Sequence, residues 1–223
     1  MSLNAKVSYE GKMDIVLMGA PGAGKGTQAV KLEQVLNCKH ISTGDVLRAE
    51  IASGSELGKK IADIIDNGDF ISDEMMVSIL KNVIAGIKED IVFDGFPRTL
   101  AQAKILEEIL SEFGRKLGKA IMISLPEEAV ISRLSARKQC LLPNGEVKQI
   151  GPNFSMQECE KQGGKVFVRP DDTPEHILHR LVVYHQRTEP VVQFYKSTGL
   201  YAEINGNQEP EKVFEDILKA VEA

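Results

Sequence analysis

The feature that most constrains the fold is a glycine-rich loop between a short apolar run and a helical segment. The loop reads GAPGAGKGTQ, from Gly19 to Gln28, and it follows the apolar residues 15–18. Glycines let backbone N–H groups crowd around a phosphate, and the start of the next helix adds a partial positive charge. The loop nearly fits the pattern G-x-x-x-x-G-K-[ST], but Gly26 stands where a hydroxyl is expected and Thr27 comes one residue late. The pattern predicts a strand, a phosphate-binding loop and a helix, the alternative being a turn that merely happens to be rich in glycine.

Apolar runs alternate with helical patterns along the rest of the chain, which predicts an α/β protein. A helix is expected over residues 25–37, and residues 99–113 carry a single apolar stripe at helical spacing. Strands rich in Ile and Val that alternate with helices form parallel sheets covered on both faces. Such strands are expected at 15–18, 91–94, 120–125 and 201–204.

Two regions interrupt this alternation and are interpreted as insertions into the sheet core. Residues 42–84 read as several short helices with no strand between them. Residues 141–169 contain LPNGEVKQIGPNF and KQGGKV, which are typical of a small, turn-rich β segment.

The composition is that of a globular protein of 223 residues, with 43% hydrophobic and 26% charged residues. A net charge of −5 argues against a general nucleic-acid binder, and no apolar run approaches the length of a membrane span. Residues 1–12 lack the apolar core of a signal peptide and precede Met13, so we expect them to be a leader or a cloning remnant. The three cysteines are too scattered for a disulfide framework, which favours the reducing cytoplasm.

Asp94 and Arg98 in the segment DGFPRT are candidate site residues. Asp94 ends a predicted parallel strand, where the ligands of open α/β sheets gather, although an aspartate there can also cap a helix. Arg98 offers a bidentate phosphate donor. Because Gly26 removes the hydroxyl that usually ligates magnesium, we expect phosphate oxygens, water and Asp94 to hold the ion.

Five further arginines form a second candidate set. Arg133 and Arg137 are spaced i, i+4, which places them on one helix face. Phosphoryl transfer spreads negative charge over the transferred group, so an arginine set can stabilise it, whereas any single arginine can be a solvated surface charge. His176 and His179 have no metal-binding partners nearby in the sequence and are interpreted as part of a solvated helix. The arginines are Arg48, Arg133, Arg137, Arg169 and Arg180.

Five motifs, taken together, resemble the adenylate kinases, which are nucleoside monophosphate kinases. They are GAPGAGKGTQ, HISTGDVLR, DGFPRT, RLSAR, and RPDD followed by HRLVVYHQRT, and the resemblance runs from about Met13 to the C-terminus. In that family the Gly-Lys-Gly-Thr form of the loop is the normal one. The resemblance implies a P-loop fold with a parallel five-stranded sheet flanked by helices, a helical NMP-binding insertion and a small β-rich lid of the long type. It implies a core at 13–41, 72–135 and 173–223, an NMP-binding arm at 42–71 and a lid at 136–172.

The resemblance also implies a function and a set of site residues. The enzyme would be a monomer that reversibly transfers the γ-phosphoryl group of MgATP to AMP, giving two ADP. Asp94 would act on magnesium through water. The residues implied for catalysis are Lys25, Arg98, Arg137, Arg169 and Arg180. Those implied for ATP are Gly22, Ala23, Gly24, Lys25, Gly26, Thr27, Arg133, Arg137 and Gln208. Those implied for AMP are Thr43, Arg48, Asp69, Phe70, Ile71, Gly95, Phe96, Pro97, Arg98, Gln102, Arg169 and Arg180.

Several alternatives stay open at this point. Thr43 could simply cap the helix that follows it, and Gln102 could lie on a wet helix face. Related UMP/CMP kinases usually carry a small alanine at the position of Thr43 and have a very short lid, which favours AMP here. GTP could replace ATP as the donor. A non-catalytic nucleotide sensor would need a broken lysine or arginine set, and a different small-molecule kinase would lack the pairing of STGD with DGFPR.

The lid departs from the family pattern at its cysteines. Many bacterial relatives with long lids hold zinc with two C-x-x-C pairs, whereas here Pro143 and Gln162 follow Cys140 and Cys159 at the second positions. Structural zinc needs four ligands. We therefore expect no zinc, and two thiols that pack as small buried hydrophobic groups. A disulfide between them is conceivable under oxidation, but a cytoplasmic setting disfavours it. Glu146, Glu158 or Glu160 could still complete a mixed site.

Overall fold

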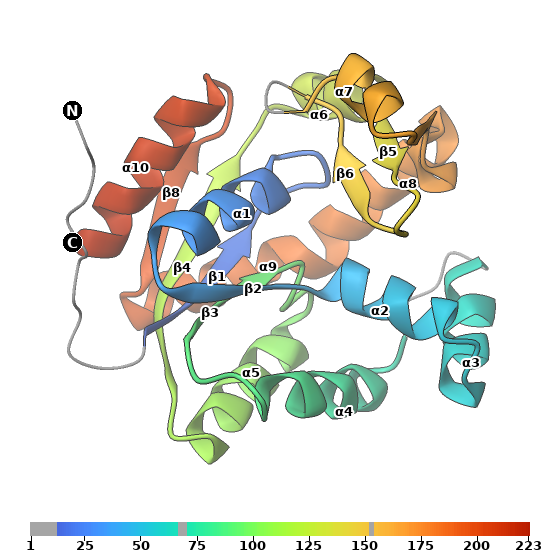
Figure 1. Cartoon of the computed structure of the whole chain (residues 1–223). Helices are drawn as coiled ribbons and strands as arrows, with labels where there is room; N and C mark the ends of the chain where they lie inside the picture. The colour runs from blue at the N-terminus through green and yellow to red at the C-terminus, as the bar shows by residue number, and fades with distance from the viewer. Residues whose placement is uncertain (1–12, 67–70, 152–153) are drawn as a thin grey trace.

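The computed structural model describes residues 13–66, 71–151 and 154–223, and its centre is a parallel sheet (Figure 1). The five strands lie in the spatial order β2-β3-β1-β4-β8 and every neighbouring pair is parallel. The predicted fold is confirmed. The strands are β1 Met13–Met18, β2 Cys38–Ser42, β3 Asp90–Asp94, β4 Lys116–Ser124 and β8 Tyr201–Asn205.

Strand β1 shows why the sheet is covered on both faces. Successive side chains of a strand point to opposite faces, so Ile15 and Leu17 join one apolar cluster while Val16 and Met18 join another. Helices α1 and α10 pack on the first face, and α4, α5 and α9 pack on the second. A strand buried on both faces must be apolar throughout, which is the pattern that the sequence shows at 15–18.

The helices follow the expected alternation with the strands. Thr99 caps the helix predicted at 99–113, since its hydroxyl accepts a hydrogen bond from the Gln102 backbone N–H at 3.1 Å. The helices are α1 Lys25–Val35, α2 Thr43–Ala52, α3 Glu56–Asp66, α4 Asp73–Ile84, α5 Leu100–Glu112, α6 Glu127–Ser135, α7 Met156–Lys161, α8 Pro174–Val183, α9 Glu189–Thr198 and α10 Pro210–Glu222, with a 3₁₀ turn η1 at Pro170–Asp172 and a π turn η2 at Tyr184–Thr188. None of the described helices is long and apolar enough to cross a membrane.

The two predicted insertions differ from the sheet core as expected. The first contains helices α2, α3 and α4. The second contains a small antiparallel sheet in which β5 (Gln139–Leu141) pairs with both β6 (Val147–Gln149) and β7 (Lys165–Phe167). It also contains helix α7, which the sequence analysis missed although Ser155 and Glu158 form a capping box at its start.

Strand β2 was also missed by the pattern analysis, which identified the other four strands. Its sequence CKHIS buries Cys38 and Ile41 but leaves the intervening positions more exposed, because β2 lies at one edge of the sheet. An edge strand contacts a neighbour on one side only and needs fewer apolar residues. The carboxyl end of β2 nevertheless forms part of the candidate site. It places His40, Ser42 and the following Thr43 at the same edge of the sheet as Asp94.

Candidate active site

The glycine loop lies between β1 and α1, at the edge where the carboxyl ends of the parallel strands meet. Gly22 has a φ of +78°, and a Cβ there would come within 2.9 Å of Leu134 Cγ, so both the backbone and the packing require glycine. The Lys25 ammonium donates to the carbonyl oxygens of Gly19 at 2.9 Å and Ala20 at 3.0 Å. The lysine is therefore held over the loop, where a phosphate group can replace the carbonyl oxygens as its acceptor.

The surroundings of Lys25 are strongly positive. Burial lowers the pKa of Lys25 to about 8; the charge of Asp94 opposes this shift, while the charges of Arg98, Arg180 and Arg137 add to it. Charged residues that lie far apart in the sequence thus act electrostatically on one ammonium group. A cluster of like charges is costly on its own and is stabilised by a bound polyanion.

The glycine at position 26 has a structural reason. A Cβ on Gly26 would lie 3.2 Å from Asp94 Oδ2, so a serine or threonine side chain would press on that carboxylate. As expected, Asp94 is the last residue of β3, the strand that pairs with β1 just before the loop. His40 Nε2 lies 3.5 Å from the same oxygen and, although buried, has no hydrogen-bond partner among the described residues. His40 was missed because its strand was missed.

Arg137 lies just before the small antiparallel sheet and pairs with a residue that follows it. Its guanidinium donates to Asp172 through Nε at 2.6 Å and Nη2 at 2.5 Å, a bidentate pair with a buried carboxylate. Asp172 was not identified from the sequence. This pair ties together the two chain segments that enter and leave the insertion.

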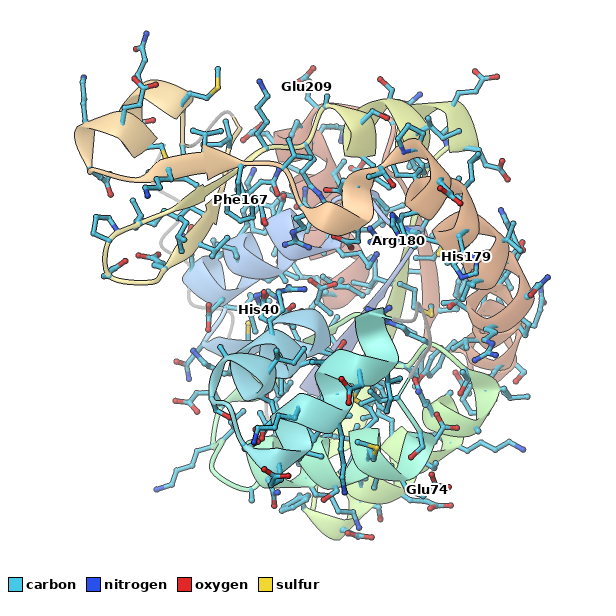
Figure 2. The ribbon with its side chains drawn as sticks, turned by 90° about the vertical axis from the view of Figure 1, so that its right-hand side faces the viewer. His40, Glu74, Phe167, His179, Arg180 and Glu209 are labelled. Carbon is cyan, nitrogen blue, oxygen red and sulfur yellow. A yellow bond between two sulfur atoms is a disulfide. The ribbon has the colours of Figure 1, made fainter. Side chains whose placement is uncertain are left out.

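Arg180 and Arg169 are also held by partners that the sequence analysis missed. Arg180, labelled on α8 in Figure 2, has Asp171 as a partner. Its Nη1 donates to Asp171 Oδ2 at 2.9 Å. Arg169 donates to Gln139 Oε1 at 2.6 Å. Burial lowers the pKa of Arg169 to about 10, with further contributions from the charges of Arg137 and Arg48. The structure thus brings Arg169 close to helix α2 as well as to Arg137.

The histidines on α8 fit the interpretation made from the sequence. His176 and His179 are both exposed, and His179 is labelled beside Arg180 in Figure 2. His176 Nδ1 lies 2.7 Å from the Thr173 hydroxyl. No group of three or more metal-binding side chains occurs within the described ranges.

The expectation that Arg133 and Arg137 share one helix face is wrong. Helix α6 ends at Ser135, so Arg137 lies beyond it and turns toward Asp172. Arg133 stays on the helix and donates through Nη2 to the Gly206 carbonyl at 3.0 Å. The i, i+4 spacing places two residues on one face only while the helix continues, and here Ala136 is already the C-cap.

Gln208 lies in the same turn after β8 as the carbonyl that Arg133 contacts. Its Nε2 donates to Asp216 Oδ2 on α10 at 3.0 Å. Arg133, Gly206 and Gln208 therefore gather at one end of the sheet, on the far side of the loop from β2.

Thr43 does not cap helix α2. The cap is Ser42, whose hydroxyl accepts from the Asp45 backbone N–H at 3.3 Å. Thr43 is buried, and its hydroxyl donates to the Asp94 carbonyl at 3.3 Å. Arg48, also on α2, pairs with Asp45 at 2.5 Å and is half exposed.

Gly95 lies next to Thr43, and Arg98 and Gln102 follow Gly95 in the chain. Arg98 Nε donates to the Gly95 carbonyl at 2.7 Å, and a Cβ on Gly95 would come within 2.9 Å of Thr43 Oγ1. Gln102 is only 6% exposed, so it does not lie on a wet helix face. Its Nε2 donates to Asp73 Oδ1 at 2.7 Å, a partner that the sequence analysis did not identify.

Four other predicted site residues are buried, and two lie outside the described residues. The side chains of Ile71 and Phe96 belong to the apolar core, and Pro97 is buried, so these residues can offer mainly backbone atoms to a ligand. Ala23 is likewise buried, in the opposite cluster. Asp69 and Phe70 lie outside the described residues.

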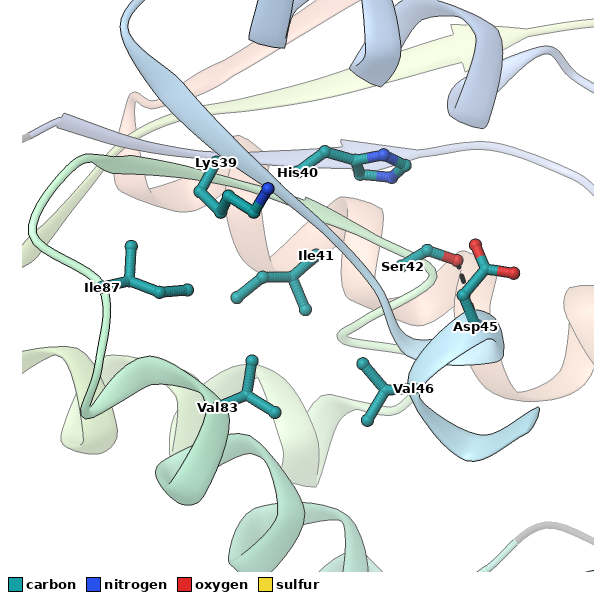
Figure 3. A pocket seen from close by; sticks show the side chains of 8 residues that line it. All are labelled: Lys39, His40, Ile41, Ser42, Asp45, Val46, Val83 and Ile87. Carbon is teal, nitrogen blue, oxygen red and sulfur yellow. Dashed lines mark hydrogen bonds between the residues drawn. The ribbon is translucent and has the colours of Figure 1, made fainter. Parts of the chain in front are cut away.

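A surface hollow lies beside the site without being part of it (Figure 3). It is bounded by β2, α2 and the end of α4, and its walls include Ile41, Val46 and Val83. None of its lining residues belongs to the glycine loop. The hollow is therefore separate from the glycine loop and from Lys25.

The two cysteines of the second insertion form a disulfide, which corrects the expectation of free thiols. Strand β5 and helix α7 bring Cys140 and Cys159 to a Cα–Cα distance of 5.9 Å, within the range that a disulfide spans. Both are fully buried, as expected, against Leu142, Ile150 and Phe154. The third cysteine, Cys38, is free and buried.

The fold and the glycine loop together define a P-loop α/β protein. A family described as adenylate kinase matches residues 17–200. The chain is 42% identical to the adenylate kinase of Elusimicrobium minutum over 94% of this chain and 98% of the relative. It is 39% identical to that of Methanothrix thermoacetophila and 37% identical to that of Archaeoglobus fulgidus, each over 94% of this chain and 98% of the relative. The chain belongs to the adenylate kinase family, a family of phosphotransferases that act on nucleoside monophosphates.

Proposed function

We propose that this enzyme transfers the γ-phosphoryl group of MgATP to AMP, reversibly, giving two ADP. An oxygen of the AMP phosphate attacks the γ-phosphorus, the bond from that phosphorus to the β–γ bridging oxygen breaks, and the oxygen leaves on ADP. The observation that carries the proposal is a cluster of positive charge: Arg137 and Arg180 both donate to the Asp172 carboxylate, and both of them, together with Arg98, lower the pKa of Lys25. Such a cluster stabilises negative charge on a transferring phosphoryl group.

The donor is proposed to lie along the glycine loop and the turn after β8. Backbone N–H groups at the start of α1 face the phosphates, and Lys25 supplies a point charge. Arg133 and Gln208 stand at the end of the sheet where the rest of the donor would extend. The proposed donor residues are Gly22, Ala23, Gly24, Lys25, Gly26, Thr27, Arg133, Arg137 and Gln208.

Magnesium fits the site as part of the nucleotide complex. Asp94 is a single carboxylate beside Gly26, and hard cations prefer oxygen ligands. One carboxylate does not make a closed protein site, which agrees with an ion that keeps water and phosphate oxygens. The ion would neutralise charge on the phosphates, and Asp94 would orient one of its waters.

The acceptor is proposed to lie between α2 and the segment that follows β3. Thr43 and Gln102 would face the base, while Arg48, Arg98, Arg169 and Arg180 would face the phosphate. These arginines already lie close enough for the pKa of Arg169 to respond to Arg48. The remaining acceptor residues are Asp69, Phe70, Ile71, Gly95, Phe96 and Pro97, of which Asp69 and Phe70 lie outside the described residues.

We propose a core at 13–41, 72–135 and 173–223, an acceptor arm at 42–71 and a lid at 136–172. Two observations support the lid: the small antiparallel sheet, and the Arg137–Asp172 pair close to its two boundaries. Closure of such a lid excludes water that could accept the phosphoryl group. We further propose a monomeric, cytoplasmic enzyme in which complete burial shields the disulfide from reductants. Its lid works without zinc, because the disulfide occupies both cysteine sulfurs.

A substrate panel tests the proposal. ATP or GTP is offered to the purified chain with AMP, GMP, CMP or UMP, and diphosphate formation is measured. We expect ATP with AMP to give the highest kcat/KM, because a site that hydrogen-bonds one base rejects bases that leave its polar groups unpaired. A comparable kcat/KM for UMP or CMP overturns the acceptor assignment. A preference for GTP over ATP overturns the assignment of ATP as the donor. If no pair of nucleotides is turned over, the result supports a non-catalytic nucleotide sensor.

A further inference from the structure

The carboxamide of Gln102 is held from both sides by groups of fixed hydrogen-bonding character. Its Oε1 accepts from the Arg98 backbone N–H at 2.8 Å, and its Nε2 donates to Asp73 Oδ1 at 2.7 Å. A backbone N–H can only donate, and an ionised carboxylate can only accept. If the amide were turned over, its NH2 would face the Arg98 N–H and its oxygen would face the Asp73 carboxylate, and neither hydrogen bond could form. The orientation of Gln102 is therefore determined by its partners.

Asp73 and Gln102 each lie in the first turn of a capped helix. Asp73 is the first residue of α4, which Ser72 caps, and Gln102 lies in the first turn of α5, which Thr99 caps. Since Gln102 is 6% exposed, little freedom is left to its side chain. Asp73 comes from another part of the chain, 29 residues away, and reaches Gln102 through tertiary packing.

The locked amide keeps one N–H and one oxygen lone pair for a ligand. A purine with a 6-amino group presents an acceptor at N1 and a donor at N6, which this arrangement complements. A purine with a 6-keto group presents the reverse, a donor at N1 and an acceptor at O6. We propose that Asp73 is a positioning residue that sets the selectivity of the acceptor site for 6-amino over 6-keto purine monophosphates by fixing the orientation of Gln102. This inference rests on the proposed function of Gln102 at the acceptor base.

The test compares AMP with IMP, which differ at the 6-position and N1, in the full-length enzyme. Asp73→Asn keeps the shape of the side chain, but an asparagine can turn either its oxygen or its NH2 toward Gln102. We expect the ratio of kcat/KM for AMP to that for IMP to fall about tenfold, the size of one charge-assisted hydrogen bond. The KM for ATP stays unchanged.

Glu74→Gln is the matched control, because Glu74 belongs to the same first turn of α4 and is exposed (Figure 2). It removes the same charge near the same helix start without touching Gln102. In Glu74→Gln, we expect the ratio of kcat/KM for AMP to that for IMP to stay within about twofold of the wild-type ratio. An unchanged ratio in Asp73→Asn, or the same fall in Glu74→Gln, overturns the inference. A wild-type enzyme that does not use AMP overturns the proposed function instead, and the inference with it.

A second measurement needs no substitution at position 73. In the wild-type protein without nucleotide, the Gln102 side-chain amide is observed by NMR after assignment with Gln102→Met. We expect one of its two protons to exchange slowly and to be shifted downfield by the carboxylate. Two rapidly exchanging, equivalent protons would overturn the inference even if Asp73→Asn failed to fold.

Discussion

At the residue scale, we expect Lys25 to contribute to turnover but not to the stability of the fold. Its ammonium is affected by the charges of Asp94 and three arginines, and its hydrogen bonds among the described residues go to backbone carbonyl oxygens of the loop. Lys25→Met should therefore lower turnover by about 10³-fold or more while leaving the unfolding temperature at neutral pH at least as high as in the wild type. Turnover assays and calorimetry check this. Lys104→Met, on the exposed face of α5, should leave both unchanged. Near-normal turnover in Lys25→Met would show that the phosphates bind elsewhere.

The pKa of Lys25 gives a second residue-scale prediction. Because the pKa in the folded protein is about 8, kcat/KM for ATP should fall as the pH rises through that value, since the free enzyme loses the charge. Lys25→Arg, which stays charged, should remove this alkaline fall. The folded pKa lies below the ordinary 10.5, so the unfolded chain binds more protons between these values. The contribution of Lys25 to the free energy of unfolding therefore rises with pH from about 8 to 10.5. A flat wild-type profile up to pH 10 would contradict the assignment.

At the scale of elements, the disulfide joins β5 to α7 and gives the small sheet a core that three short strands could not form alone. In denaturant, we expect one reactive thiol per chain before reduction and three after it, since Cys38 is free and Cys140 and Cys159 are paired. Reduction should lower the free energy of unfolding by about 2–4 kcal/mol. Cys140→Ala should abolish this dependence on reductant, whereas Cys38→Ala should keep it. Three reactive thiols before reduction would rule out the bond.

At the scale of the whole molecule, one buried ion pair holds three strands together. Arg115, just before β4, donates to Asp14 on β1 at 2.6 and 2.8 Å, and Asp14 also accepts from the backbone of Ile91 on β3 at 2.8 Å. Arg115 further donates to the carbonyl oxygens of Ile87 and Glu89. Hydrogen bonding to Asp14 raises the pKa of Arg115. Both side chains are almost completely buried.

Asp14→Ala should lower the free energy of unfolding by about 3–5 kcal/mol, because it leaves the Arg115 charge buried without its partner. Urea unfolding monitored by circular dichroism measures this change. Glu112→Ala, which removes an exposed partner of Lys81, should change stability by about 1 kcal/mol or less. Replacing both members of the buried pair with apolar residues of similar size should recover much of the loss. Equal effects of Asp14→Ala and Glu112→Ala would contradict the role of the pair.

Local patterns in the sequence determined the elements and the outline of the site. The glycine loop, the apolar strands, the helix starts and the motif containing Asp94 depend on neighbouring residues, so spacing and residue type were enough to predict them. The helix at 99–113, for example, differs from the structure only at its two ends. Strand β2 and helix α7 were missed because an edge strand and a short helix carry few apolar residues.

Tertiary structure alone decided the partners of the charged and polar residues. Asp14 and Arg115 are 101 residues apart, Arg137 and Asp172 are 35 apart, and Gln102 and Asp73 are 29 apart. No local pattern records such a pairing, because it exists only when packing buries both groups and removes the water that would otherwise satisfy them. The same is true of Cys140 and Cys159, whose bond depends on how β5 meets α7. The sequence thus determined which groups could hold phosphate, and the folded structure decided which neighbours orient them, because orientation requires contacts between distant segments.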